Sequence, residues 1–240
     1  MNGTTIVDSS APRLTWPSTN FEQIEAVAQT EGCLADLWEG SPVRLDSNPP
    51  NTDEIIDILF PGNPLLCCGW TRHHFGTRPR AHWYNLHKLQ FIVPNPMKSR
   101  RGLTQEGHVS HHTLENTGPR RFVIIEFDFD AKRSTEEARL IATLQRQGCD
   151  VRDLSAALLM HLAEKAPMAL VVFSGAKSLH GWFYCSEVQE DKVLRFFRYA
   201  VSVGADPANW TRSKFTRMPD GLRENQKRQT VYFLNPKVVK

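Results

Sequence analysis

The pattern of apolar and polar positions is clearest after residue 120. Residues 121–129 form a mostly apolar run that is β-branched in its middle, which predicts a buried strand. Ser134-Thr135-Glu136-Glu137 is a typical helix start, and the apolar spacing behind it predicts a helix that ends near Gly148. The patterns that follow predict a helix over 153–165, strands over 168–173 and 179–185 joined by a turn, a helix over 188–203 and a strand over 230–234.

The order of these elements predicts an α+β fold. Strand, helix, helix, strand, strand, helix and strand follow one another, which is the split βαβ arrangement of ferredoxin-like folds and RNA-recognition motifs. An antiparallel sheet of this kind carries its helices on one face. We therefore expect the other face of the sheet to be free for a ligand.

The first half of the chain has a weaker pattern. Its predicted elements are a helix over 21–38 with a break near Gly32, a loop over 40–51, a short helix from Thr52 to Pro61, a strand over 89–93 and a polar loop or small β segment over 97–120. This pattern divides the chain into an N-terminal extension with a helix (1–50), an N-terminal α/β module (51–120) and a module like an RNA-recognition motif (121–240).

The distribution of charge suggests a polyanionic partner. The chain has 240 residues and a formal charge of +3, which is too small by itself to indicate nucleic-acid binding. From residue 206 to residue 240, however, eight Lys or Arg stand against three acids, a surplus larger than that of the whole chain. A basic end beside an acidic site suits a polyanion bound next to a metal ion.

The composition also bears on the location of the protein. The N-terminus is polar and no apolar run approaches the ~20 residues that span a bilayer, so we expect no membrane partner. The five Cys are an odd number without disulfide-framework spacing. Reduced thiols and a cytoplasmic, intracellular location are the expectation.

Carboxylates alternate at the end of the predicted strand 121–129. Side chains two residues apart on a strand point to the same face, so Glu126, Asp128 and Asp130 should line one face. Crowded carboxylates repel each other unless a divalent cation lies between them, and Mg²⁺ or Mn²⁺ prefers such hard oxygen ligands. The alternative is an edge strand with a solvated acidic face. The apolar run before Glu126 favours the metal site.

The predicted turn between the next two strands carries candidate phosphate donors. Lys177, Ser178 and His180 lie in or beside it, and its backbone N–H groups could also hold phosphate oxygens. The spacing is not that of a Walker loop. Taken alone, these residues are more typical of a plain hairpin turn with a His on its second strand.

The basic tail adds a carboxylate and two guanidinium groups. Asp206 precedes Pro207, so it is either a third metal-binding carboxylate or a helix N-cap. Arg217 and Arg223 could contact phosphates bidentately or lie in a solvated loop.

With these segments together, the chain resembles the archaeo-eukaryotic primase superfamily, the primases and primase-polymerases of archaea, eukaryotes, plasmids and viruses. The family pattern is an acidic pair that ends a hydrophobic strand, a small-x-His element, and a third acidic or basic motif followed by an Arg-Leu-Pro-like stretch. The matching segments are Ile124-Ile125-Glu126-Phe127-Asp128, Ser178-Leu179-His180, and Asp206 with Phe215-Thr216-Arg217-Met218-Pro219. The first acid is Glu rather than Asp, and Asp130 leaves the pair Asp128/Asp130 as an alternative.

The resemblance implies a template-dependent nucleotidyltransferase, a DNA primase or primase-polymerase core that works with two Mg²⁺ or Mn²⁺ ions. Its catalytic and metal-binding residues would be Glu126, Asp128 and Asp206. Its residues for the incoming nucleoside triphosphate would be Lys177, Ser178, His180, Arg217 and Arg223. The implied partners are a single-stranded DNA template, nucleotides, and a replicative helicase on another chain or on a segment outside this one.

Two other functions are compatible with the sequence. A binding module without catalysis would stack single-stranded bases on aromatic residues of the predicted hairpin, namely Trp182, Phe183 and Tyr184. A metal-dependent nuclease would use the same acids as the polymerase.

Overall fold

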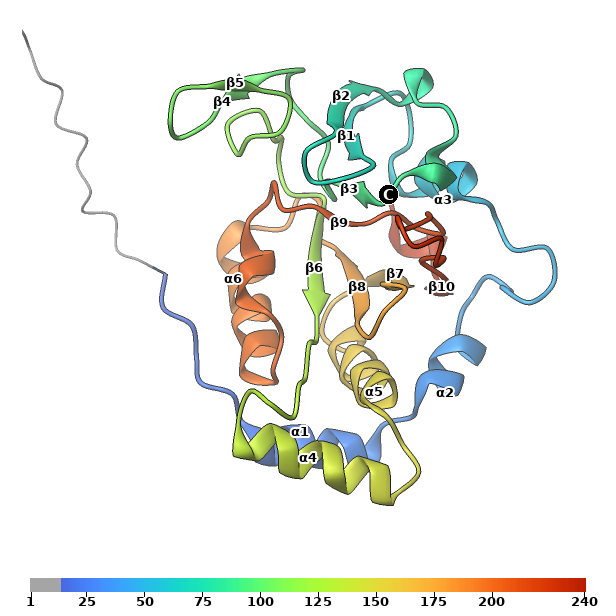
Figure 1. Cartoon of the computed structure of the whole chain (residues 1–240), viewed down its shortest axis with the longest axis vertical. Helices are drawn as coiled ribbons and strands as arrows, with labels where there is room; N and C mark the ends of the chain where they lie inside the picture. Colours follow the sequence, from blue (N-terminus) through green and yellow to red (C-terminus); the bar gives the residue numbers. More distant parts are fainter. Residues whose placement is uncertain (1–13) are drawn as a thin grey trace, which may run out of the picture.

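The computed structural model describes residues 14–240, so the start of the expected N-terminal extension lies outside the described residues. The chain is a mixed α+β structure built on two four-stranded antiparallel sheets (Figure 1). The first sheet has the order β10-β7-β8-β6. Its strands are β6 (Phe122–Glu126), β7 (Met168–Phe173), β8 (Leu179–Tyr184) and β10 (Val231–Leu234).

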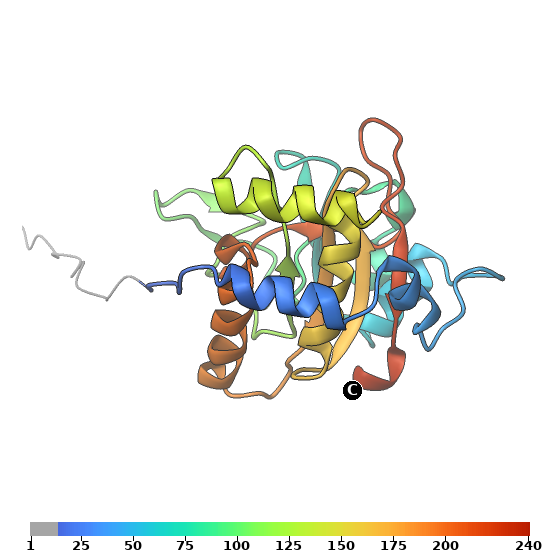
Figure 2. The same ribbon diagram turned by 90° about the horizontal axis from the view of Figure 1, so that it is seen from below.

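Helices cover one face of this sheet. Figure 2 shows α1 and α4 running side by side across the bottom of the molecule. The helices are α1 (Phe21–Thr30), α2 (Leu34–Glu39), α4 (Thr135–Arg146), α5 (Val151–Ala163) and α6 (Glu190–Ser202). Side-chain caps fix two of the starts, since Ser134 accepts from the N–H of Glu137 and Asp150 accepts from the N–H of Asp153.

The second sheet belongs mostly to the first half of the chain. Its order is β2-β1-β3-β9, and its last strand comes from the C-terminal part. Its strands are β1 (Leu65–Gly69), β2 (Phe75–Pro79), β3 (Phe91–Ile92) and β9 (Thr216–Arg217). The elements around it are α3 (Thr52–Leu59), the hairpin β4 (Gly102–Leu103) and β5 (Val109–Ser110), and 3₁₀ turns at η1 (Arg80–His82), η2 (Leu86–Lys88), η3 (Pro207–Trp210) and η4 (Pro236–Val238).

The expectation of a free sheet face is wrong. Val123 and Ile125 of β6 face the helices, whereas Phe122, Ile124 and Trp182 face a second core shared with α3 and β1. Trp182 and Phe183 are fully buried, so they offer no stacking surface. The physical reason is the continuous apolar run of β6, because a strand with one solvated face would alternate with polar residues.

The order of elements along the chain agrees with the predicted β-α-α-β-β-α-β order. Strands β6 and β7 both run antiparallel to β8, which lies between them as in a split βαβ unit. Strand β10 pairs with β7 and so lies at the edge opposite β6. β6 is therefore an edge strand of its sheet by hydrogen bonding, although its side chains are buried.

The predicted segment boundaries 50 and 120 do not separate the packing. Helices α1 and α2 pack against α5, which follows residue 120. Strand β9 pairs with β3, and Leu234 N donates to Ser41 Oγ at 3.0 Å. Segments on either side of both boundaries are thus joined by packing and hydrogen bonds.

Among residues 14–240, no helix has the length and apolar character needed to cross a membrane. All five Cys are free thiols.

Candidate functional site

Glu126, Asp128 and Asp206 line one cavity of ≈ 430 Å³, which we call the acidic cavity. Glu126 ends β6, and Asp128 follows it in an irregular segment. Asp206 reaches the same place because its N–H donates to the Glu126 carbonyl at 2.9 Å and Phe127 forms a β-bridge with Ala205. Two of the segments singled out in the sequence therefore meet through backbone hydrogen bonds.

The strand register brings the predicted turn residues to Glu126. Glu126 lies opposite His180 in the pairing of β6 with β8. Ser178 Oγ donates to Glu126 Oε1 at 3.0 Å, and His180 Nε2 lies 3.4 Å from the same oxygen. The turn 174–178 is closed by the Ser174 N–H, which donates to the Ser178 carbonyl at 2.8 Å. The carboxylate of Glu126 is thus held by a hydroxyl and an imidazole.

His180 is buried, with only 5% of its surface exposed. Its Nδ1 lies 3.2 Å from Thr216 Oγ1, so both ring nitrogens have protein partners. Burial lowers the pKa of His180 below its ordinary value, and the Glu126 carboxylate opposes this effect only in part. The imidazole is therefore neutral at neutral pH. Its geometry suits orientation of Glu126 and Ser178 better than direct contact with a ligand in the cavity.

Asp128 carries two cationic partners. Lys177 Nζ lies 2.7 Å from Asp128 Oδ1, and Arg133 Nη2 lies 3.2 Å from Oδ2. The hydrogen bond to Asp128 raises the pKa of Lys177. The Lys177 side chain is half exposed, so it can turn from Asp128 toward a phosphate in the cavity.

Asp130 differs from the other acids. Its carboxylate accepts from the Lys132 N–H at 3.0 Å, which holds its pKa below the ordinary value. Its own N–H donates to Glu137 Oε2 at 2.7 Å. Asp130 does not line the acidic cavity. This placement favours Glu126/Asp128 over Asp128/Asp130 as the acidic pair.

Asp206 is the N-cap of η3, and it also lines the acidic cavity. Oδ1 accepts from the Ala208 N–H at 2.9 Å and caps η3. Oδ2 pairs with Lys214 Nζ at 3.0 Å and lies at the cavity wall. One oxygen of the Asp206 carboxylate therefore caps η3, and the other pairs with Lys214 beside the acidic cavity.

Arg217 is a buried guanidinium group near Glu126 and near two other arginines. Arg217, on β9, lies within electrostatic range of Arg223, Arg72 and Glu126. Burial is the main cause that lowers the pKa of Arg217 to about 10, and the two neighbouring arginines act in the same direction. Arg217 therefore remains charged at neutral pH. Cations crowded in this way are typical of a site that binds phosphate.

The donor atoms fit a divalent metal, and the three carboxylates stand apart from one another around the cavity. Glu126, Asp128 and Asp206 offer hard oxygens to one cavity, and ammonium groups already lie on two of them. The three carboxylates do not come within 4.8 Å of one another as a set. The side chains of Asp128 and Asp206 are 37% and 36% exposed, so both can rotate toward a shared ion.

The fold brings to the site several residues that were not predicted from the sequence. Arg72 comes from the turn after β1, Thr216 from β9 and Arg133 from the segment before α4. Arg133 follows Asp128 by five residues, a local signal that was open to use. Arg72 and Thr216 carry no such signal because their contacts depend on long-range pairing.

A separate group of metal-capable side chains lies at the meeting point of α1 and α5. Glu31, His161 and Glu164 each offer an atom within 4.8 Å of the others. His161 Nε2 lies 2.7 Å from Tyr199 Oη, which orients the ring. This group was not predicted and is remote in sequence from the acidic cavity.

No protein-family model, no curated protein and no solved structure matches the chain. The assignment of a function therefore depends on the residues of the site.

Proposed function

We propose that the protein is a template-dependent nucleotidyltransferase, the catalytic core of a DNA primase or primase-polymerase. One observation carries the proposal. The acids line one cavity. The Lys-Ser-x-His turn contacts Glu126 and Asp128, and Arg217 of the basic segment lies within electrostatic range of Glu126, although these segments are far apart in the sequence. Acids for divalent metal and cations for a triphosphate in one place are the components of nucleotidyl transfer.

The proposed roles follow from the contacts. Glu126, Asp128 and Asp206 would hold Mg²⁺ or Mn²⁺, and the bound ions would activate the attacking hydroxyl and stabilise the leaving pyrophosphate. Lys177 is the half-exposed cation nearest to Asp128 and would exchange that carboxylate for a phosphate of the nucleotide. Arg217 and Arg223 would bind the remaining phosphate charge.

Ser178 and His180 have a positioning role in this proposal. Both lie on Glu126 Oε1, and His180 is neutral and buried. They would fix the direction of the Glu126 carboxylate toward the cavity. His180 would affect nucleotide binding through Glu126 and Ser178.

The proposed fold is a module like an RNA-recognition motif, packed on an N-terminal α/β module. The chain order of elements after residue 120 and the split βαβ pairing of β6, β8 and β7 support it. The position of β10 beside β7 is a departure from that motif.

A nuclease would use the same carboxylates, so product length separates the two activities. The test is incubation of the protein with labelled single-stranded DNA, Mn²⁺ or Mg²⁺ and nucleoside triphosphates of each kind. We expect products longer than the label or new primers. Shortened strands would establish the nuclease and overturn the proposal.

A matched pair of variants tests the site in the same assay. Asp206→Asn keeps an N-cap for η3, because Asn caps as well as Asp, but removes the negative charge from the cavity. The control is Asp191→Asn, which removes an exposed acid of α6 paired with Arg195. Product should be lost in Asp206→Asn alone. Equal product from both variants would remove Asp206 from the site.

A further inference from the structure

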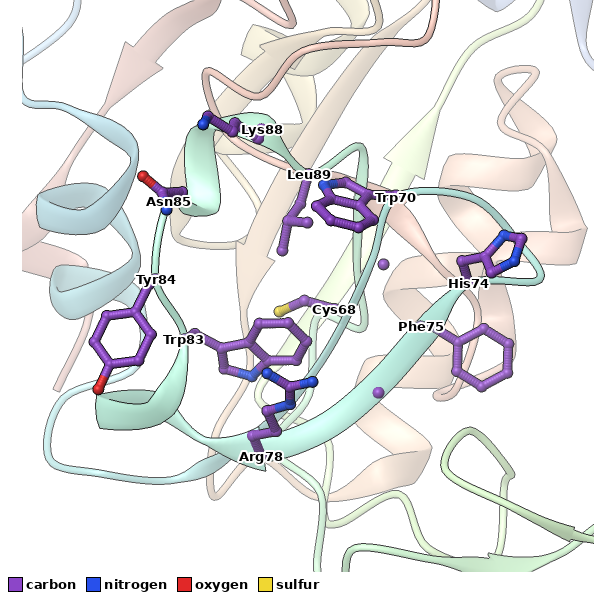
Figure 3. Close-up of a pocket in the computed structure, with 12 residues that line it drawn as sticks. Cys68, Trp70, His74, Phe75, Arg78, Trp83, Tyr84, Asn85, Lys88 and Leu89 are labelled. Atoms are coloured by element: carbon purple, nitrogen blue, oxygen red, sulfur yellow. The ribbon is translucent and has the colours of Figure 1, made fainter.

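A further cavity lies on the α/β module and not among the acids. It has ≈ 560 Å³, and its lining combines aromatic rings with cations and contains no carboxylate. Figure 3 shows Trp70 and Trp83 at its centre, Phe75 beside them, and Arg78 and Lys88 at its edges. We call it the aromatic pocket.

Two aromatic side chains of the aromatic pocket are largely exposed to solvent. Trp70 is 58% exposed and Tyr84 is 76% exposed. Trp83 lies deeper, with its indole N–H donating to the Leu66 carbonyl at 3.1 Å and the Arg78 guanidinium 4.9 Å from its ring centroid. Large exposed rings beside cations are typical of surfaces that stack bases and hold phosphates.

Trp70 is presented on a fixed backbone. Its N–H donates to the His74 carbonyl at 3.0 Å, and Gln90 Nε2 donates to its carbonyl at 2.6 Å. Thr71 Oγ1 accepts from the N–H of His74 at 2.9 Å and closes the turn. Because these hydrogen bonds fix the backbone of Trp70, stacking of a base on its ring costs little backbone conformational entropy.

Another cavity adjoins the aromatic pocket and extends to Arg223. It has ≈ 400 Å³ and shares Trp70 and Lys88 with the aromatic pocket, and its far wall includes Arg223. Arg223 Nη1 donates to the Ser174 carbonyl at 3.0 Å, at the start of the turn that carries Lys177. One acid, Glu224, lines this cavity. The path from Trp70 past Lys88 to Arg223 therefore carries more positive than negative charge.

We infer that single-stranded DNA binds along this path, with a base stacked on Trp70 in the aromatic pocket and its backbone directed past Lys88 and Arg223 toward the acidic cavity. The identity of the strand as a template rests on the proposed function. The stacking surface itself rests on the lining, the exposure and the charge of the aromatic pocket.

The test is equilibrium binding of a fluorescent oligo-dT of about 15 nucleotides, measured by anisotropy with the full chain. EDTA is present and nucleotides are left out, so binding is measured apart from catalysis. We expect Trp70→Ala to weaken binding about 5-fold or more, because loss of one stacked base has an effect of this size. Trp70→Phe, which keeps a ring, should restore most of the affinity.

A charge variant measures the phosphate contacts. Lys88→Gln should lower the slope of log affinity against log salt by about 1, whereas Lys192→Gln, on the exposed surface of α6, should leave the slope unchanged. Duplex DNA and RNA of the same length are the competing ligands. Tighter binding of either one, or equal affinities of Trp70→Ala and the wild-type protein, would overturn the inference.

The two proposals fail separately. If Trp70→Ala loses the oligonucleotide but the wild-type protein makes no product, the proposed function fails and the stacking surface stands. If Trp70→Ala binds normally while Asp206→Asn abolishes product, the aromatic pocket is overturned and the active site stands.

Discussion

The acidic cavity and the aromatic pocket differ in how their charges are balanced. In the acidic cavity the three candidate metal ligands already have partners: Glu126 has Ser178, Asp128 has Lys177 and Asp206 has Lys214. In the aromatic pocket Arg78 and Lys88 have no carboxylate beside them in the lining. The first region can therefore exchange one ion for another, whereas the second has uncompensated positive charge beside exposed rings.

The comparison teaches which part of a nucleotide each region can recognise. Exchange of ammonium for metal or phosphate suits the triphosphate and the reacting hydroxyl. Rings with nearby cations suit a base and its backbone phosphate. If both proposals hold, chemistry and strand recognition lie in different modules, and variants should separate them cleanly.

The largest difference between the effect on synthesis and the effect on strand binding is expected from Asp128→Ala. Loss of this carboxylate should lower the rate of primer synthesis about 10³-fold or more, since metal ions contribute several kcal/mol to the transition state. The affinity for oligo-dT without metal should stay the same or rise, because a negative charge is removed. Steady-state synthesis and anisotropy measure the two effects, with Asp130→Asn as a control that keeps activity. Wild-type levels of product from Asp128→Ala would refute the site.

The same Gly→Ala change should act differently in the helix-covered core of the first sheet and in the aromatic pocket. At Gly181 of β8 a Cβ would lie 2.4 Å from Leu159 Cδ2 of α5, so we expect a loss of about 1–3 kcal/mol in the free energy of unfolding. At Gly76, in the aromatic pocket, the nearest atoms to a Cβ are 4.0 Å away, and the change should be close to neutral. Urea denaturation of both variants measures this. Similar losses at the two positions would contradict the packing.

A weaker effect on the acidic cavity is expected from Lys177→Met. The nucleotide loses one charge-assisted contact, so its KM should rise about 10-fold while the affinity for oligo-dT changes little. Lys132→Met is the control, because Lys132 contacts Asp130 through its backbone N–H. An unchanged KM would remove Lys177 from the triphosphate site.

The smallest effect concerns pH. Burial lowers the pKa of His180 in the folded state, so below about pH 6.5 the unfolded chain binds the proton more readily and stability falls as pH falls. In His180→Gln the fall between pH 7 and pH 5 should be shallower. His112, whose pKa burial also lowers, contributes the same slope to both proteins. Denaturation across this range decides, and identical slopes would show that His180 is not titrated on unfolding.

Much of the second half of the fold could be predicted from the sequence. Periodicity and caps located α4, α5 and α6, and the apolar runs located β6, β7 and β8 within a few residues. The acids after β6 and the turn at Ser178 were found for the same reason, since both lie beside strong patterns. Local sequence patterns were thus sufficient to locate these residues of the candidate site.

The aromatic pocket and the covered sheet face could not be found in this way. β1 contains two adjacent Cys and β9 has only two residues, so neither shows an alternating pattern. Trp70, Lys88 and Arg223 become neighbours through long-range hydrogen bonds, since Gln90 N donates to the Gly69 carbonyl at 3.1 Å and Leu222 N donates to the His87 carbonyl at 2.9 Å. The sequence did indicate the covered face, because β6 is apolar on both sides.

The pairing of β9 with β3 also orders the events of synthesis. A nascent chain that has emerged only as far as residue 215 contains every carboxylate of the acidic cavity, but it lacks the strand that completes the sheet of the α/β module. Arg217 and Arg223 are added last. During translation, the two arginines therefore join the site after its carboxylates and after Lys177 and Lys214, which pair with them.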